Sequence, residues 1–327
     1  MKIAWLLASF VAGIAITWVV RNLSPHLNLV SQPKEIVPKH RGPVAFSGGI
    51  AIALTVMFAT LFAQVAAAQD APLIPLAVWI PTLLFLFVGV IDDVRPLHAV
   101  AKVALQIAAA TVAVLLGLRW HVTGIEAPDI VITILWLVLL VNAFNVTDVC
   151  DGLVGGLAII ILVFAGARTP EPWLPLVTIG ATLGFLVFNR PPATIFLGDG
   201  GSHMLGFIVG ATLLSLAPAT PSWKHAAAAV IACGVVLLEV ALLMYSRTRT
   251  GIPWWRGSPH HFSLRLQARG LSRLATDMVA WSVATLLCAI AWFLPLISDV
   301  MAITVTLAVA VVLAAAGFIL MRWDAHR

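Results

Sequence analysis

The sequence has few charged residues for its length. Charged side chains make up 10% of the 327 residues, whereas hydrophobic residues make up 61%. A soluble globular domain normally carries about 25% charged residues, because water must solvate its surface. The composition therefore excludes an ordinary soluble protein and predicts an integral membrane protein whose apolar surface is solvated by lipid.

Cysteine and the common nucleotide-binding motifs are also scarce or absent. Cys150, Cys233 and Cys288 are an odd number of cysteines, far apart and in apolar surroundings. This pattern implies neither a disulfide framework nor a metal cluster, so we expect small core residues at these positions. The sequence contains no Walker loop and no GxGxxG unit. Any nucleotide must therefore be held in another way.

Apolar runs long enough to cross a bilayer recur along the chain. A transmembrane helix needs about 20 apolar residues. Residues 3–20 are followed directly by Arg21, which favours a retained first helix over a cleaved signal peptide. The pattern predicts an all-α membrane protein, a single polytopic domain over residues 1–327, with about eleven spans: 3–20, 44–68, 73–91, 99–118, 129–147, 152–167, 172–188, 201–217, 226–246, 276–296 and 299–321.

Lysine and arginine are divided unequally between the two sides of this topology. Cations accumulate in cytoplasmic loops because their translocation is disfavoured. One side holds only Lys2, Arg119, Arg168 and Lys224. We expect the other side to be cytoplasmic, because it holds fifteen cations: Arg21, Lys34, Lys39, Arg41, Arg95, Lys102, Arg190, Arg247, Arg249, Arg256, Arg265, Arg269, Arg273, Arg322 and Arg327.

This orientation has three consequences. The N-terminus lies outside, the C-terminus lies in the cytoplasm, and the two long loops 21–43 and 247–275 are cytoplasmic and contribute to the active site.

The net charge of +5 is explained by topology, so nucleic acid is not expected as a partner. Small residues along several spans could pack helices within one chain or between two, which leaves a homodimer open.

Acidic residues gather where the predicted spans end. A carboxylate at membrane depth is costly and tends to mark function. Asp92 and Asp93 end the third span, Asp148 and Asp151 end the fifth, and Asp199 precedes the eighth. Any one of them could be an ordinary interfacial residue. Three acidic motifs on the same predicted face favour one shared site.

The residue types at this face suit a metal ion and a phosphate. Carboxylates without Cys or His partners favour a hard cation, and Mg²⁺ commonly binds through one or two carboxylates plus substrate phosphates. Mn²⁺ is the alternative ion. Asn142 and Asn145 can donate hydrogen bonds, and Lys102 can act as a point charge on phosphate. The sequence therefore predicts a phosphate-bearing substrate.

Five stretches, in order, resemble the motifs of the polyprenyl-phosphate N-acetylhexosamine-1-phosphate transferase family (glycosyltransferase family 4). They are PKHRGPVAFSGGIAI, DDVRPLHAVAKVALQ, NAFNVTDVCDGLVGG, FNRPPATIFLGDGGS and RGSPHHFSLRLQARGLS. The span count and the last stretch are more similar to the undecaprenyl-phosphate N-acetylglucosamine 1-phosphate transferases than to the enzyme of peptidoglycan synthesis. The resemblance implies transfer of a sugar phosphate, GlcNAc-1-phosphate first, from a UDP-N-acetylhexosamine to undecaprenyl or another polyprenyl phosphate. The products are UMP and a lipid-linked sugar for cell-envelope glycans, made at the cytoplasmic face of the inner (plasma) membrane.

The resemblance also implies roles for individual residues. Asp199 and Asp92 match metal-binding positions. Asp93 matches a residue that acts as a base or organises the attacking phosphate. The positions that line the diphosphate region are matched by Lys102, Asn145 and Asp148. The positions of the uridine pocket are matched by Asp151, Asn189 and Phe196.

The loop 247–275 departs from the family pattern. His260 and His261 are present, but Ser263 and Leu264 stand where relatives often have further histidines. His261 matches a diphosphate-contacting residue, and Arg265, four residues later, would share its helical face as a further substrate contact. The same segment also has the pattern of an interfacial amphipathic helix. Val149, where relatives usually have glycine, is a second departure.

Three other functions remain open on this sequence. A phospho-N-acetylmuramoyl-pentapeptide transferase would use the same motifs on a different donor. A catalytically inactive scaffold is motivated by Val149 and the thinned histidine cluster. An ion-coupled transporter would use its acids as ion sites, but such acids are expected near the bilayer midplane rather than at span ends.

Overall fold

The computed structural model describes residues 2–31, 43–67, 75–169, 172–216 and 221–323. The described chain is mostly helical. The helices and two short strands are α1 (Lys2–Leu23), η1 (Ser24–Leu27), β1 (Val30–Ser31), β2 (Val44–Ala45), α2 (Gly48–Ala67), α3 (Leu76–Val94), α4 (Ala99–Leu115), α5 (Glu126–Thr147), α6 (Leu153–Gly166), α7 (Trp173–Asn189), α8 (Gly198–Leu214), α9 (Trp223–Ala232), α10 (Gly234–Thr250), α11 (Phe262–Ala268), α12 (Arg273–Phe293), η2 (Leu294–Leu296) and α13 (Asp299–Met321).

Several helices have the length and composition of membrane spans. Among the described residues, six qualify: α1, α2, α3, α5, α12 and α13. The pair α9 and α10, bent by 72° at Cys233, would make a seventh if it is one span. Shorter apolar helices are α4, α6 and α7. The multi-pass, helical membrane architecture is confirmed, whereas the count of eleven spans stays a prediction.

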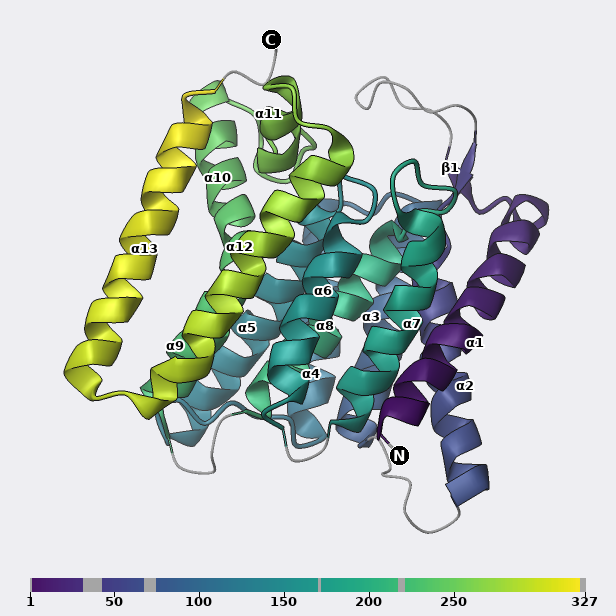
Figure 1. Ribbon diagram of the computed structural model, residues 1–327, viewed down its shortest axis with the longest axis horizontal. Coiled ribbons are helices and arrows are strands. Elements are labelled where there is room, and N and C mark those ends of the chain that lie inside the picture. Colours follow the sequence, from purple (N-terminus) through teal and green to yellow (C-terminus); the bar gives the residue numbers. More distant parts are fainter. Residues whose placement is uncertain (1, 32–42, 68–74, 170–171, 217–220, 324–327) are drawn as a thin grey trace.

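The ion pairs of the described residues lie at the two ends of the bundle. At one end, Arg119 pairs with Glu126 and Lys224 pairs with Asp299. At the other end, the acidic motifs meet α11 and the start of α12. Figure 1 shows that α1 begins at one end and α13 finishes at the opposite one. We call the end that carries the acidic motifs the acidic end.

A small two-stranded sheet closes the acidic end beside α2 and α8. Strand β1 pairs antiparallel with β2, and Ala45 forms a bridge to Ile195. Gly48 and Gly49 then donate backbone hydrogen bonds to the carbonyls of Phe196 and Leu197. These bonds fix the segment just before α8. The sequence pattern did not predict this sheet, and Lys34, Lys39 and Arg41 of the expected loop 21–43 lie outside the described residues.

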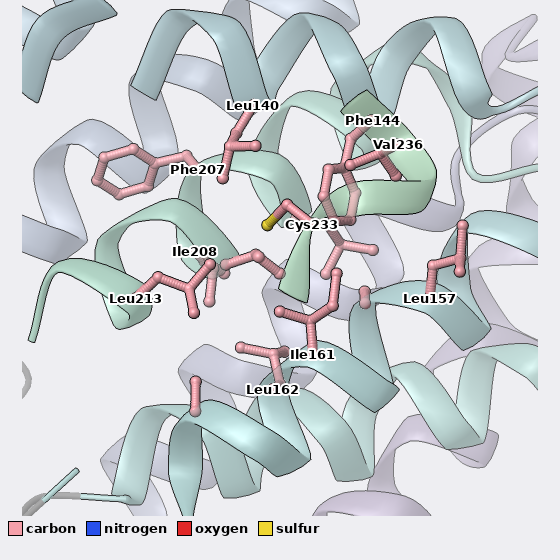
Figure 2. Packing of buried hydrophobic residues seen from close by; sticks show 14 of the residues in the cluster. Leu140, Phe144, Leu157, Ile161, Leu162, Phe207, Ile208, Leu213, Cys233 and Val236 are labelled. Carbon is pink, nitrogen blue, oxygen red and sulfur yellow. The ribbon is translucent and has the colours of Figure 1, made fainter. Parts of the chain in front are cut away.

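Helix α8 lies at the centre of the core. Every residue from Gly200 to Leu214 is buried, against α3, α5, α2 and α6. Figure 2 shows the packing of Phe207 and Ile208 of α8 with Leu140 of α5 and Ile161 of α6 around Cys233. A helix buried all round has its ends fixed by its neighbours, so α8 is a rigid support for whatever stands at its start.

The cysteines largely behave as expected. Cys233 and Cys288 are buried and free, which confirms the prediction of small core residues. Cys150 differs, because it is half-buried and its Sγ accepts a hydrogen bond from Gln267 Nε2 at 3.0 Å.

Two glycines allow α2 and α3 to approach the start of α8. A Cβ on Gly89 would lie 2.4 Å from the main-chain carbon of Asp199, and one on Gly49 would lie 2.3 Å from Gly201 Cα. Both distances are far below contact distance and both neighbours are backbone atoms. Only glycine therefore permits this packing.

We expect Gly89→Ala to lower the free energy of unfolding by about 1–3 kcal/mol, because the added methyl group overpacks a buried backbone contact. The melting temperature of the purified protein measures this loss. Gly257→Ala is the matched control, since a Cβ there would meet no atom within 4 Å. Equal melting temperatures for the two variants would contradict the close packing of α3 on α8.

Candidate active site

Lys102 holds two carboxylates together at the acidic end. Its Nζ, on α4, lies 2.7 Å from Asp92 Oδ2 of α3 and 2.8 Å from Asp199 Oδ2 of α8. The same nitrogen donates to Asn145 Oδ1 of α5 at 3.1 Å. Four helices therefore place one cation, two carboxylates and an amide at a single point, and we call these four residues the lysine cluster.

Further hydrogen bonds hold the side chains of the lysine cluster in place. Asp92 Oδ1 accepts a hydrogen bond from the backbone N–H of Leu97 at 2.6 Å. Asn145 Nδ2 donates to the buried Ser202 Oγ at 3.1 Å. The side chain of Asp92 is 12% exposed and that of Asp199 is 34% exposed. Asp199 is thus the carboxylate of the pair more open to solvent and to a ligand.

Asp93 has a different environment from Asp92. Its Oδ1 and Oδ2 accept backbone hydrogen bonds from Asp199 at 3.0 Å and Gly200 at 3.1 Å. These donors belong to the first turn of α8, where backbone N–H groups lack intrahelical partners and a negative charge is favoured. Asp93 therefore fixes the start of α8 and the position of Asp199, and both of its oxygens are engaged in doing so.

Asp148 lies beyond the end of α5 and is half-buried. Within the described residues its carboxylate forms no hydrogen bond or ion pair. Burial, followed by the nearby charges of Asp199, Asp93 and Asp151, raises the pKa of Asp148 well above its ordinary value. A ligand that brings a cation or a hydrogen-bond partner would therefore stabilise the ionised carboxylate of Asp148.

Asp151 and Asn189 connect the loop before α6 to the loop before α8. Asp151 Oδ2 pairs with Arg273 Nη1 of α12 at 2.8 Å and accepts from the backbone N–H of Ala193 at 3.2 Å. The buried Asn189 accepts from the N–H of Gly152 at 2.9 Å and donates to the carbonyl of Ile195 at 2.8 Å. Both side chains are used in shaping this part of the acidic end.

Phe196 lies between these loops and β2. It is half-buried, and its backbone N–H donates to the carbonyl of Ala45 at 2.7 Å. The structure therefore places it on the same fixed segment as Asn189 and the start of α8.

His261 and Arg265 make contacts inside the protein. His261 Nδ1 lies 2.6 Å from Glu239 Oε1 of α10, and both side chains are buried. The guanidinium of Arg265 donates to the carbonyls of Leu320 and Trp323 at the end of α13 and to Ser246 Oγ. These contacts hold α11 against α10 and α13. Other residues of the loop, Gln267 and Arg273, contact Cys150 and Asp151.

The convergence of Asp92 and Asp199 fits a divalent cation. Two hard carboxylate oxygens from different helices lie within 2.8 Å of one nitrogen, so they already point at a common cationic centre. Within the described residues, no group of three or more His, Cys, Asp or Glu side chains is arranged around a metal site. Mg²⁺ needs only one or two carboxylates when substrate phosphates and water supply its other ligands.

The chain is similar to several known proteins. The family model described as glycosyl transferase family 4 matches residues 75–217. A probable undecaprenyl-phosphate N-acetylglucosaminyl 1-phosphate transferase of Bacillus subtilis (strain 168) is 26% identical over 302 residues, 85% of this chain and 80% of the relative. A decaprenyl-phosphate N-acetylglucosaminephosphotransferase of Mycolicibacterium smegmatis is 31% identical over 275 residues, 75% of this chain and 67% of the relative.

A third relative carries another name. A phospho-N-acetylmuramoyl-pentapeptide-transferase of Acetivibrio thermocellus is 31% identical over 268 residues, 72% of this chain and 77% of the relative. The chain belongs to glycosyl transferase family 4. The matched range 75–217 of this family 4 protein contains the whole lysine cluster and the two loops joined by Asp151 and Asn189.

A second polar layer lies one helical turn deeper in the bundle. Asn142 Nδ2 donates to Gln106 Oε1 at 2.7 Å, and Gln106 Nε2 lies 3.3 Å from His203 Nε2. Gln106 and His203 are fully buried. Sequence spacing could have revealed them, because Gln106 and His203 follow Lys102 and Asp199 by four residues and so share their helix faces.

Asp277 is a second feature that the sequence pattern did not reveal. It is fully buried in α12, and neither carboxylate oxygen has a hydrogen-bond partner in the described part of the chain. Its Oδ2 lies beside Gly152, and it follows Arg273 by one helical turn. No acidic motif surrounds it in the sequence, so only the packing of α12 on the loop before α6 brings it near the acidic end.

Proposed function

We propose that this protein transfers N-acetylhexosamine 1-phosphate, GlcNAc-1-phosphate first, from a UDP-sugar to undecaprenyl or another polyprenyl phosphate, with release of UMP. The observation that carries the proposal is the lysine cluster, in which Lys102 brings Asp92 and Asp199 together at the end of a membrane bundle. The names of two relatives support the substrate class. Such a step would supply the first lipid-linked sugar of a cell-envelope glycan.

The reaction is a single displacement at phosphorus. A phosphate oxygen of the polyprenyl phosphate forms a bond to the β-phosphorus of the UDP-sugar. The bond between that phosphorus and the oxygen bridging to the α-phosphate breaks, and UMP leaves with the electron pair. Because a phosphate monoester has a second pKa near 6, the attacking oxygen is largely ionised at neutral pH, and a strong general base is not required.

The side chains would contribute mainly position and charge, which is what phosphoryl transfer requires. Lys102 neutralises charge on the diphosphate, with Asn145 as a donor beside it. Asp93 holds the start of α8 and thereby orients Asp199. The carboxyl group of Asp148, which has no hydrogen-bond or ion-pair partner among the described residues, would contact the diphosphate.

Asp92 and Asp199 would hold Mg²⁺, with Mn²⁺ as the alternative. The bound ion would supply neutralisation of the negative charge that develops on the phosphate oxygens. Lys102 now occupies the space between the two carboxylates, so its ammonium group would turn toward the substrate phosphates in the loaded enzyme.

The uridine pocket is proposed at Asp151, Asn189 and Phe196, since stacking on an aromatic ring suits a pyrimidine. Asn189 and Asp151 would act chiefly by shaping the loops, because their polar atoms are already paired. The roles of His261 and Arg265 in contacting the diphosphate stay predictions. Their contacts support a role in holding α11, and through it Gln267, against the loop of Cys150.

The finer topology is also proposed. One polytopic domain with eleven crossings, counting the bent pair α9 and α10 once, would leave the N-terminus outside and the C-terminus in the cytoplasm. The acidic end would then face the cytoplasm of a cell with an inner or plasma membrane, where UDP-sugars are available. A homodimer remains compatible with the apolar outer faces of α1 and α13.

A phospho-N-acetylmuramoyl-pentapeptide transferase is the second candidate. The Acetivibrio thermocellus relative so named covers most of the chain at an identity equal to that of the Mycolicibacterium smegmatis relative. The two candidates use the same chemistry and differ in the sugar nucleotide.

A donor panel tests the proposal. Purified full-length protein is supplied with polyprenyl phosphate, Mg²⁺ and, separately, UDP-GlcNAc, other UDP-N-acetylhexosamines and UDP-N-acetylmuramoyl-pentapeptide. UMP release with a UDP-N-acetylhexosamine supports the main proposal, and release only with the pentapeptide donor supports the second candidate. No release with any donor would overturn both and favour an inactive scaffold.

A further inference from the structure

A small groove lies outside the lysine cluster, between the end of α1 and the segment 187–194. Its volume is about 240 Å³, and its lining includes Arg21 of α1 together with Phe188, Arg190 and Thr194. None of the described residues that line it is acidic. Within the described part of the chain, the groove therefore places two arginines together without a carboxylate.

Neither guanidinium group pairs with a carboxylate in the described part of the chain, although Arg21 Nη2 donates to Asn22 Oδ1 at 3.4 Å. Arg21 Nη1 donates to Thr194 Oγ1 at 3.3 Å, and its guanidinium carbon lies 5.1 Å from the centroid of the Phe188 ring. The side chain of Arg190 is exposed and forms no hydrogen bond or ion pair in the described part of the chain. Two positive charges that line one groove favour a bound anion there.

The position of the groove indicates what kind of anion it would meet. Arg21 lies in the last turn of α1, a helix long and apolar enough to cross a membrane, and Arg190 caps the end of α7. The last turn of a spanning helix lies at the bilayer surface, at the level of the lipid headgroups.

Apolar surface continues from the groove down the outside of the bundle. Val187, one turn before Arg190, also lines the groove and is 40% exposed. A ligand with a phosphate at one end and a hydrocarbon chain at the other would match this combination. A free inorganic anion would use only the arginines.

We propose that this groove is a binding site for the phosphate of an anionic phospholipid headgroup, separate from the lysine cluster. Arg21 and Arg190 hold the phosphate, and Val187 with Phe188 contacts the start of the acyl chains. A short series of hydrogen bonds connects the site to the candidate uridine pocket. Thr194 donates backbone and side-chain hydrogen bonds to the Phe188 carbonyl, and the neighbouring Ala193 donates to Asp151.

The test measures lipid binding rather than turnover, so it does not depend on the proposed function. Purified full-length protein is equilibrated with equal amounts of phosphatidylglycerol and phosphatidylcholine, and bound lipids are counted by native mass spectrometry. The wild type is expected to retain phosphatidylglycerol in preference. Arg21→Gln combined with Arg190→Gln should weaken that binding by on the order of 10-fold or more, since each basic residue at a lipid surface contributes about a fivefold factor.

Arg249→Gln is the matched control. Arg249 also lies in the last turn of its helix, is exposed, and stands 5.9 Å from the ring centroid of Tyr245, but it does not line the groove. Its replacement should leave the bound phosphatidylglycerol unchanged. If the double variant unfolds, Arg190→Gln alone serves, because this side chain forms no hydrogen bond or ion pair in the described part of the chain and its loss should still weaken binding several-fold.

Three results would overturn the proposal. One is an equal loss of phosphatidylglycerol in the Arg249→Gln variant. Another is displacement of the lipid by millimolar inorganic phosphate, which would make the groove a general anion site. The third is displacement by one equivalent of polyprenyl phosphate, which would make it the site of the acceptor lipid.

Discussion

Replacing Asp199 with asparagine is expected to reduce UMP release by about 100-fold to 1,000-fold, the usual effect of removing a group that stabilises charge in the transition state. Asp199 Oδ2 is one of the two carboxylate oxygens on Lys102, and it is the more exposed of them. An amide cannot neutralise a metal ion and is a weak ligand for Mg²⁺. The initial rate of UMP release from the best donor of the panel measures the effect.

Asp299→Asn is the control for the Asp199 variant. Asp299 is also a carboxylate in the first turn of a helix and pairs with a lysine, Lys224, at 3.0 Å, but it lies at the other end of the bundle. Its replacement should leave turnover unchanged. Chelation with EDTA should stop the wild-type reaction, and excess Mg²⁺ or Mn²⁺ should restore it. Turnover of the Asp199 variant within threefold of the wild type would contradict the metal assignment.

Replacing Lys102 with methionine is expected to lower turnover by at least 100-fold and to lower the melting temperature as well. The ammonium group compensates two carboxylates and contacts Asn145, and its side chain is only 15% exposed. Removing one partner of a largely buried ion pair leaves the opposite charges uncompensated, which is strongly destabilising. Turnover and thermal unfolding of the same preparation measure the two effects.

Lys102→Arg separates the two roles of this side chain. Arginine keeps the positive charge, so it should recover much of the melting temperature. It should recover little turnover, because a planar guanidinium cannot take the place of a compact ammonium group between three oxygens. Lys224→Met, at the other end of the bundle, should leave turnover unchanged. Full turnover in the Lys102→Arg variant would show that only charge is needed there.

The broad architecture could be predicted because composition and charge act along the whole chain. A span of apolar residues must be helical in lipid, since its backbone groups have no other hydrogen-bond partners. The acids at the ends of spans could likewise be recognised one by one, because a charge at that depth is conspicuous in an apolar sequence. Counting the spans predicts that four of these acids lie at one end of the bundle: Asp92, Asp148, Asp151 and Asp199.

The individual contacts could not be predicted, because they join residues far apart in sequence. Asp199 meets Lys102 across 97 positions, and Asp151 meets Arg273 across 122. The sequence predicts that Arg265 contacts the substrate beside His261, four residues away, and this role stays a prediction. The structure adds partners that the spacing does not reveal, because the Arg265 guanidinium donates to the end of α13 and His261 lies beside Glu239 of α10. Helical spacing identifies a shared face but not the neighbour that face will meet.

The buried features show a related limit. Asp277, Gln106 and His203 are buried polar groups whose importance depends on what packs around them. Each lies in a largely apolar helix, where a polar residue can equally face water at a span end. The spacing of Gln106 and His203 from Lys102 and Asp199 indicates shared helix faces, but the burial of Asp277 becomes visible only when α12 is placed against the loop before α6.

The central claim is that the β-phosphate moves with the sugar to the lipid. Incubating the full-length protein with polyprenyl phosphate, Mg²⁺ and UDP-GlcNAc carrying ³²P at the β-position tests it directly. If another UDP-N-acetylhexosamine is the better donor, that donor is used in the same way. We predict that the label enters the organic phase as a polyprenyl-diphospho-sugar, while label at the α-position stays in the aqueous phase as UMP. Lipid that gains the sugar without the β-label, with UDP as the aqueous product, would contradict the account.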